Sequence, residues 1–284
     1  MTDSLGGTAQ AVAFYSGHPI SAALVLARLR AARGNLDGVQ PEELWAHDQD
    51  HFGGLAANDT MAALAGIGPG SRVADFCAGL AGPARYYAHV FGADVTGVEL
   101  TLARVTGAAE LSRLVGLQDR VRVLAGDVTQ APLPDGQFDA VVSQEALLHV
   151  PDKGAALAEA FRVLRPGGRV VFSDWACHTP LVPEDAALMW QGMAAQTLQS
   201  LPGYHKLLEQ AGFTAIGIED MTDAWGPILR ERLRMYQAMR AEAAAAGTPP
   251  GNDAFHRSYV RFVELILARQ LGGIRAVASK PDGR

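Results

Sequence analysis

The stretch VADFCAGLAGPARYYA, residues 73–88, decides the fold that the sequence predicts. It begins with a short apolar run typical of a β-strand, continues through a glycine-containing turn and ends in residues that favour a helix. A strand, a tight turn and a helix in this order commonly bind the phosphate or sugar of a nucleotide. Cys77 and Ala81, however, stand where such turns usually carry glycine. The rest of the chain must therefore indicate whether a nucleotide-like molecule binds here, and which one.

Short runs rich in β-branched residues alternate with helical patterns from about residue 70 onward. This alternation indicates repeated βαβ units, and therefore a parallel sheet with helices on both faces. Strands are predicted at residues 72–76, 94–99, 121–125, 138–143, 168–174, 214–220 and 274–279. The sequence thus predicts an α/β fold with a seven-stranded, mostly parallel sheet.

The chain divides into four predicted segments. Residues 1–69 are predicted to form a helical N-terminal cap, and residues 70–224 the core of the fold. Residues 225–270 have apolar side chains at helical spacing and are predicted to form a helical lid insertion, followed by a final strand and tail at 271–284. A cap and a lid favour an enclosed pocket, which suits a small molecule better than a protein or nucleic acid.

The composition, with 49% hydrophobic and 19% charged residues, is typical of a soluble globular protein. The net charge of −6 and the scattered arginines disfavour nucleic-acid binding. No uncharged apolar stretch reaches the roughly 18 residues that span a bilayer, and the N-terminus lacks the pattern of a signal peptide. Because the chain has only two cysteines, no disulfide framework is expected. We therefore expect a cytoplasmic protein without a membrane partner.

Acidic residues follow successive predicted strands, at the edge of a parallel sheet where ligands bind. Asp75, Glu99, Asp127 and Asp174 occupy these positions. A carboxylate at the end of the second strand, as at Glu99, can accept hydrogen bonds from both hydroxyls of a ribose. The glycine spacing that binds a dinucleotide pyrophosphate is absent from residues 77–83, whereas a ligand without phosphates relaxes that demand. Each acid alone could equally be a helix cap, but their joint placement favours a ligand site.

Residues 70–180 together resemble the class I S-adenosylmethionine-dependent methyltransferases. The segments that carry the resemblance are VADFCAGLAG, VTGVEL, AGDV, FDAVVSQEALLHVPD and LRPGGRVVFSDW. The resemblance implies a Rossmann-like fold, S-adenosylmethionine as cofactor and S-adenosylhomocysteine as product. It also implies a set of cofactor-binding residues: Asp75, Ala78, Gly79, Glu99, Leu100, Asp127, Val128 and Gln144. Among these, Gly79 and its neighbours would contact the methionine moiety, Glu99 the ribose, and Asp127 with Val128 the adenine amino edge.

The segment SQEALLHVPD, residues 143–152, holds the candidate catalytic residues. Glu145 and His149 are four residues apart and would share a face if a helical turn begins there. The segment resembles that of methyltransferases acting on phosphoethanolamine, sarcosine or dimethylglycine, in which the histidine can pair with an N-terminal tyrosine; Tyr15 is the candidate here. Alternatively, His149 is structural, and Glu145 is a solvated residue or the acid that sterol and prenyl-diphosphate C-methyltransferases use.

Further candidates lie in the cap and the lid. In WAHDQDHFGG, residues 45–54, His47 and His51 have the spacing of a metal pair on a helix, but the following Gly-Gly indicates a loop, and no metal is expected. The resemblance instead implies that His51 belongs to a segment closing over the methionine end of the cofactor, a surface loop being the alternative. Three aromatic residues are candidate substrate or lid contacts, although a stripe at helical spacing is more often core: Trp175, Tyr236 and Tyr259. The arginines at 230, 232 and 234 suit an anionic substrate, but alternating arginines on a helix are usually solvated.

These observations predict an enzyme that methylates a small molecule, first at nitrogen, next at oxygen, with carbon of an isoprenoid or sterol as the main alternative. A cofactor-binding protein without catalysis is opposed by the polar residues Gln144, Glu145 and His149, and a nicotinamide-dependent oxidoreductase by the missing glycine spacing. The lid helices could also support a homodimer. The identity of the acceptor depends on pocket residues outside the resemblance.

Overall fold

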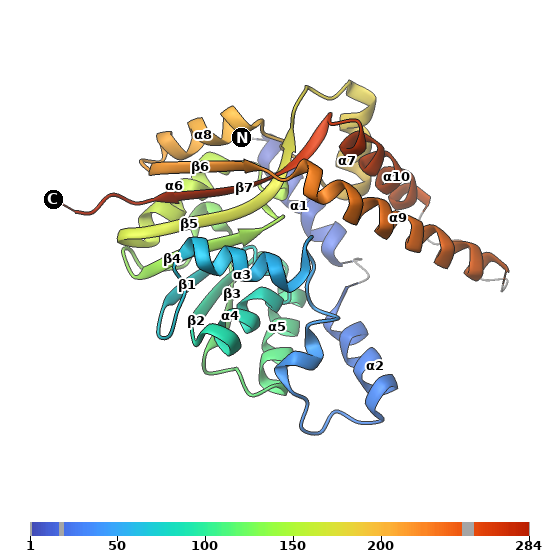
Figure 1. The fold of residues 1–284 in the computed structure, drawn as a ribbon, viewed down its shortest axis with the longest axis horizontal. Coiled ribbons are helices and arrows are strands. Elements are labelled where there is room, and N and C mark those ends of the chain that lie inside the picture. Colours follow the sequence, from blue (N-terminus) through green and yellow to red (C-terminus); the bar gives the residue numbers. More distant parts are fainter. Residues whose placement is uncertain (1, 17–19, 246–252, 284) are drawn as a thin grey trace.

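The structure, a computed structural model, describes residues 2–16, 20–245 and 253–283, which contain a seven-stranded sheet of order β3-β2-β1-β4-β5-β7-β6 (Figure 1). The strands are β1 (Arg72–Phe76), β2 (Asp94–Glu99), β3 (Val121–Ala125), β4 (Phe138–Gln144), β5 (Leu164–Cys177), β6 (Thr214–Asp220) and β7 (Leu271–Ser279). The first five pair in parallel, whereas β7 runs antiparallel between β5 and β6. The predicted α/β fold with a seven-stranded, mostly parallel sheet is confirmed.

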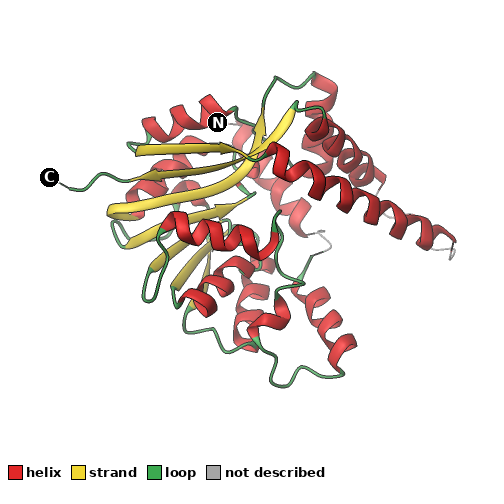
Figure 2. Ribbon diagram, viewed as in Figure 1, coloured by secondary structure: helices red, strands yellow, loops and turns green. Residues whose placement is uncertain are grey.

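Helices cover both faces of the sheet (Figure 2). On one face lie α3 (Gly54–Ala65), α4 (Gly82–Phe91) and α5 (Leu102–Leu114), and on the other α6 (Lys153–Val163) and α8 (Leu201–Gln210). Because both faces are covered, the central strands are apolar almost throughout: four of the five residues of β1 are buried. Two apolar cores result, one on each side of the sheet.

The remaining helices lie around the carboxyl ends of the central strands and beside them. They are α1 (Thr2–Ser16), α2 (Ala22–Arg33), α7 (Pro183–Met193), α9 (Thr222–Ala245) and α10 (Asp253–Leu267), with short 3-10 turns η1 (Pro41–Leu44), η2 (Val128–Gln130) and η3 (Leu147–His149). In Figure 1, α9 extends well beyond the body of the molecule. Its partner α10 is fastened to α7 through Arg261, which pairs with Asp185. No helix in the described ranges combines the length and apolarity needed to cross a membrane.

Three strands are longer than predicted: β4 by one residue, and β5 and β7 by more. The sequence Pro166-Gly167-Gly168 marks a turn, but β5 begins before it, and the register with β4 shifts between Leu164 and Arg169 to accommodate the extra residues. At the start of β7, Gly273 has little strand propensity, yet it pairs with Trp175. A Cβ at position 273 would come within 2.3 Å of the Trp225 ring, so a close packing contact explains this glycine.

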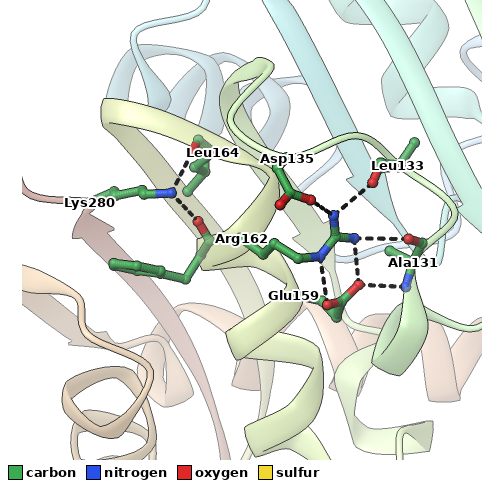
Figure 3. A network of polar contacts seen from close by, with 8 residues as sticks. Ala131, Leu133, Asp135, Glu159, Arg162, Leu164 and Lys280 are labelled. Carbon is green, nitrogen blue, oxygen red and sulfur yellow. Dashed lines mark hydrogen bonds and ion pairs between the residues drawn. The ribbon is translucent and has the colours of Figure 1, made fainter. Parts of the chain in front are cut away.

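A polar network fixes the loop between η2 and β4 (Figure 3). Arg162 donates to the carbonyl oxygens of Ala131 and Leu133 and pairs with Glu159 and Asp135. These contacts attach the loop to α6, and thereby support the neighbouring segment that carries Asp127.

Candidate active site

A cavity that is partly open to solvent lies at the carboxyl ends of the central strands. It is lined by residues from β1, β2, β4 and the segments that follow β3 and β4, together with the cap. The predicted site residues that line it are Tyr15, His51, Asp75, Ala78, Gly79, Glu99, Leu100, Asp127, Val128, Gln144, Glu145 and His149. The fold thus brings together the proposed cofactor-binding and catalytic residues.

The turn after β1 adopts a left-handed backbone at three positions, and only one of these is a glycine. Cys77, Gly79 and Ala81 have φ values of 61°, 56° and 60°, in the left-handed region. Each non-glycine residue there costs on the order of 1 kcal/mol or more, which the surrounding contacts must offset. One such contact is the buried carboxylate of Glu99, which accepts hydrogen bonds from the backbone N–H of Gly79 at 3.0 Å and of Thr101 at 2.8 Å. Glu99 therefore holds the turn against the end of β2.

Two further acids at this edge differ in their surroundings. Asp75 is buried, and its Oδ2 has no hydrogen-bond partner among the described residues. Burial and the nearby charge of Glu99 raise the pKa of Asp75 to about 8. Asp127, by contrast, caps η2, since its Oδ1 accepts hydrogen bonds from the N–H and hydroxyl of Thr129. Asp75 is thus a buried carboxyl group at the edge of the cavity that is largely protonated at neutral pH.

Tyr15 of α1 and His149 of η3 form a hydrogen-bonded pair, with Tyr15 Oη 2.7 Å from His149 Nε2. His149 Nδ1 lies 2.9 Å from the carbonyl oxygen of Ala194. Because a carbonyl only accepts, Nδ1 carries the hydrogen and Nε2 accepts the tyrosine O–H. Burial, together with the nearby cations Lys153 and Arg104, lowers the pKa of His149 to about 4, and burial raises the pKa of Tyr15 well above its usual range. Both side chains are therefore neutral near pH 7.

Asp174 and Lys153 anchor the η3 turn that holds His149. Asp174 lies outside the cavity lining, and its Oδ1 accepts the N–H of Leu148 at 3.0 Å. Lys153 donates to the carbonyl of Leu147 and to Thr197 Oγ1. This buried network fixes the short η3 turn, and with it the position of the imidazole.

Glu145 does not begin a helix, since its φ is 52° and η3 starts two residues later. The predicted helical turn with His149 is therefore not formed, although both side chains line the cavity. The Glu145 carboxylate accepts the backbone N–H of Phe52 at 2.7 Å. Desolvation by the cavity wall raises the pKa of Glu145 to about 8. Glu145 can thus exchange a proton near neutral pH.

Residues 45–53 form turns rather than a helix, so His47 and His51 do not make the helical metal pair that their spacing suggests. Within the described residues, no group of three or more His, Cys, Asp or Glu side chains is arranged to hold a metal ion. His51 contacts the side chain of Gln49 and the carbonyl of Phe52, and burial lowers its pKa.

A buried ion pair attaches this segment to α4. Arg85 Nη2 lies 2.8 Å from Asp48 Oδ2, and both side chains are almost fully buried. Close packing adds to the attachment, because a Cβ on Gly82 would lie only 2.1 Å from the backbone oxygen of Asp48. The segment therefore forms one wall of the cavity beside the turn after β1.

Three predicted substrate or lid residues do not line the cavity. Trp175 stacks on Phe262, with ring centroids 3.8 Å apart, inside an apolar cluster. Tyr236 and Tyr259 pack with Phe255 between α9 and α10. The structure gives these aromatic residues packing roles.

Arg232 is exposed, as expected for alternating arginines on a helix, and it also contacts the segment of residues 45–54. Its Nη2 donates to the carbonyl of His51 at 3.0 Å, and its guanidinium carbon lies 4.8 Å from the centre of the Phe52 ring. It therefore connects α9 to the segment of residues 45–54.

Other cavity residues were missed by sequence reasoning, namely Ala11, Ile20, Asp48, Asp50 and Arg104. Asp48 and Asp50 lie within the stretch of residues 45–54 that contains the candidate histidines, whereas Ala11 and Ile20 lie outside any motif. Arg104 lies on the first turn of α5, five residues after Glu99. This position could have predicted that Arg104 faces the same edge of the sheet as Glu99.

A family model described as a methyltransferase domain matches residues 74–172. Phosphoethanolamine N-methyltransferase 1 of Arabidopsis thaliana is 32% identical over 181 residues, which are 64% of this chain and 36% of that protein. The glycine/sarcosine/dimethylglycine N-methyltransferase of Actinopolyspora halophila is 31% identical over 163 residues, 57% of this chain and 29% of that protein. Residues 74–172 thus match a methyltransferase domain, and the chain is similar to class I S-adenosylmethionine-dependent methyltransferases. It spans about a third of the length of these two curated relatives.

The methyltransferase fold is also that of a solved structure, the phosphoethanolamine N-methyltransferase 2 of Haemonchus contortus in complex with phosphomonomethylethanolamine and S-adenosylhomocysteine. The two superpose with a TM-score of 0.73 at 22% identity, over 93% of this chain and 61% of the other. At this identity the likeness establishes the fold alone, so the chemistry of this chain must be argued from its own residues.

The polar groups of the cavity fit the cofactor that defines these methyltransferases. S-adenosylmethionine carries a ribose diol, an ammonium group and a sulfonium ion, but no phosphate. Glu99 supplies a fixed carboxylate at the end of β2, and the buried carboxyl group of Asp75 also lines the cavity. The turn through Gly79 has the left-handed backbone that allows close approach of a ligand.

The buried ion pair between Asp48 and Arg85 should stabilise the folded chain strongly. Arg85→Met leaves the Asp48 carboxylate buried without its counter-ion, and we expect the free energy of unfolding to fall by about 3–5 kcal/mol in urea titrations. The double variant with Asp48→Asn removes the unpaired charge and should lose less than the sum of the single variants. A loss below about 1 kcal/mol for Arg85→Met would show that the pair does not hold the segment.

The raised pKa of Glu145 predicts a pH dependence of stability without ligand. A carboxyl group whose pKa rises from its usual value near 4.5 to about 8 on folding stabilises the protein most below pH 4.5, and this stabilisation is lost as pH rises through 8. The free energy of unfolding should therefore fall between pH 6.5 and 8, and less steeply in Glu145→Gln. Asp75 contributes a residual slope of the same sign. The exposed Glu110→Gln is the control, and equal slopes in all three proteins would contradict the assignment.

Proposed function

We propose that this chain transfers the methyl group of S-adenosylmethionine to a nitrogen atom of a small molecule bound in the cavity, with Tyr15, His149 and Glu145 as its catalytic residues. The observation that carries the proposal is the neutral, hydrogen-bonded pair of Tyr15 and His149, which lines the same cavity as Glu145 and Glu99. The cap that supplies Tyr15 belongs to the cavity wall, which supports a small acceptor rather than a macromolecule.

The bound cofactor supplies an electrophilic methyl group on a sulfonium ion, so the protein must orient the acceptor and remove one proton. An amine that enters as an ammonium ion must first lose a proton, and the ionised fraction of Glu145, which grows as pH approaches its pKa of about 8, can accept it. A remaining N–H can donate to Tyr15 Oη, while the tyrosine proton moves to His149 Nε2. The imidazolium so formed keeps its Nδ1–H bonded to the carbonyl of Ala194. The residues thus provide a route for the proton that methylation releases.

The charges of the cavity favour an amine over a diphosphate. Arg104 is the one arginine or lysine among the described lining residues, and it is already paired with Asp50. A prenyl diphosphate would find few cations, whereas an amine would find the carboxyl group of Glu145. The same buried carboxyl group supports carbon methylation as the second candidate, because it could stabilise a carbocation or take a proton from it. Oxygen acceptors use the same proton route as amines.

An acceptor screen tests the proposal. Purified protein is incubated with methyl-labelled S-adenosylmethionine and matched sets of small amines, phenols, amino acids and prenyl diphosphates, and labelled products are identified by mass spectrometry. Label on nitrogen, lost in Tyr15→Phe, supports the proposal. Label only on carbon, lost in Glu145→Gln but retained in Tyr15→Phe, supports the second candidate and overturns the first. Cofactor binding without transfer to any acceptor class would favour the non-catalytic alternative.

Several finer assignments belong to the proposal rather than to the observations that support it. They are the roles of the individual cofactor-binding residues, the division into cap, core, lid and tail, action in the cytoplasm, and a homodimer formed through the lid helices. For the dimer, α9 supplies an exposed apolar pair at Met235 and Met239.

A further inference from the structure

Arg104 is a buried cation in a strongly acidic cavity. It lies on the first turn of α5, and only 8% of its surface is exposed. Six carboxyl groups line the same cavity: Asp48, Asp50, Asp75, Glu99, Asp127 and Glu145. Of the lining residues that the structure describes, no other is an arginine or a lysine. A ligand group with negative charge therefore has one place in this cavity where it meets a full positive charge.

The guanidinium of Arg104 is only partly used. Nη2 donates to the carbonyl oxygen of Ile20 at 3.3 Å and to Asp50 Oδ2 at 3.1 Å. Nε is buried and has no hydrogen-bond partner within the described part of the chain. The hydrogen bonds of Arg104 within the described residues come from Nη2, so Nη1, which lies beside Gly79, keeps its donors for an acceptor on the ligand.

The position of this guanidinium relates it to one end of the cofactor. Nη1 lies 2.8 Å from the place that a Cβ on Gly79 would occupy, so the group rests directly on the turn after β1. We infer that Arg104 binds the carboxylate of the methionine moiety of S-adenosylmethionine beside Gly79. The inference deepens the proposed function and rests on it. The ammonium and sulfonium groups of the cofactor suit the surrounding acids, whereas its carboxylate would be repelled by them without Arg104.

The other contacts of Arg104 connect the bound carboxylate to the cap. Its guanidinium carbon lies 4.3 Å from the centre of the Tyr15 ring, within the range of a cation–π contact. Ile20 and Asp50 belong to the segments on either side of α2. Arg104 therefore contacts the cofactor turn and the catalytic tyrosine at once.

Two ligands that differ only in the carboxylate distinguish a carboxylate contact of Arg104 from a general structural role of this residue. The dissociation constants of S-adenosylhomocysteine and of its decarboxylated analogue are measured by calorimetry for wild type, Arg104→Met, Arg104→Lys and the control Arg113→Met, an exposed arginine on the same helix. We expect Arg104→Met to weaken S-adenosylhomocysteine about 10- to 100-fold and to leave the analogue within about 3-fold. Arg104→Lys should lose less, and Arg113→Met should match wild type.

The outcomes distinguish a failure of the carboxylate assignment from a failure of the proposed function. If Arg104→Met weakens both ligands equally, or wild type binds both equally well, the carboxylate assignment is wrong while the proposed function stands. If wild type binds neither ligand, the proposed function fails and the inference fails with it. If Arg104→Met does not fold, the dissociation constants of wild type and Arg104→Lys are compared instead. The lysine keeps the charge but loses the planar group. If Arg104→Lys changes the binding of both ligands equally, the inference is overturned.

Discussion

His149→Ala should lower kcat for methyl transfer about 100-fold or more, while the dissociation constant of S-adenosylhomocysteine changes little. In the proposed mechanism the imidazole accepts the Tyr15 proton, and general base catalysis of this kind contributes roughly 100- to 10,000-fold. Because the pKa of His149 is lowered to about 4, the imidazole is already in its basic form at neutral pH, and we expect no loss of activity from its titration between pH 6 and 8. Initial rates at saturating cofactor, with the acceptor from the screen, provide the measurement.

Two variants sharpen this test. Tyr15→Phe should cost a similar factor, and the double variant little more than either single one, because the two side chains act as a unit. His205→Ala removes an exposed histidine of α8 and should leave kcat unchanged. A kcat within twofold of wild type in His149→Ala, or fully multiplicative losses in the double variant, would mean that the pair is structural.

Glu99→Ala should weaken S-adenosylhomocysteine binding by about 100-fold or more. The Glu99 carboxylate accepts hydrogen bonds from the N–H groups of Gly79 and Thr101, and we propose that it also accepts them from the ribose hydroxyls. Each charge-assisted hydrogen bond is worth about 1.5–3 kcal/mol, so the loss of two gives a factor of this size. Calorimetric titration at constant pH measures the change.

Glu99→Gln is the matched variant for Glu99→Ala. It keeps one acceptor for the turn but lacks the charge, and it should fall between wild type and Glu99→Ala. Glu110→Gln, on the exposed side of α5, should bind as wild type does. Binding by Glu99→Ala within threefold of wild type would remove Glu99 from the cofactor site.

The strand ends were predictable because parallel strands bring their carboxyl ends to one edge, and that rule placed Asp75, Glu99 and Asp127 around one cavity. The unusual turn was harder to assess. Cys77 and Ala81 adopt the left-handed backbone usually left to glycine, and only the tertiary contacts, such as the Glu99 anchor, show that the chain tolerates it.

Other parts of the site could not be found from sequence patterns. Trp175 and Tyr259 have the spacing of a helical or strand face, and this spacing is the same whether the face borders a cavity or a core. The role inferred for Arg104 could not be predicted from the sequence, because its contacts lie in three segments that meet only in the folded chain. These contacts are Ile20, Asp50 and the turn at Gly79. No local pattern in the sequence reports such a meeting point.

The most direct test of the central claim is a calorimetric titration of the purified wild-type protein with S-adenosylmethionine, S-adenosylhomocysteine and NAD. The account predicts micromolar binding of the first two ligands and none of NAD, because the cavity offers acids for a ribose and for cationic groups but no glycine spacing for a pyrophosphate. Binding of NAD alone would contradict it, and would mean that the turn at Cys77 and Ala81 serves a different ligand.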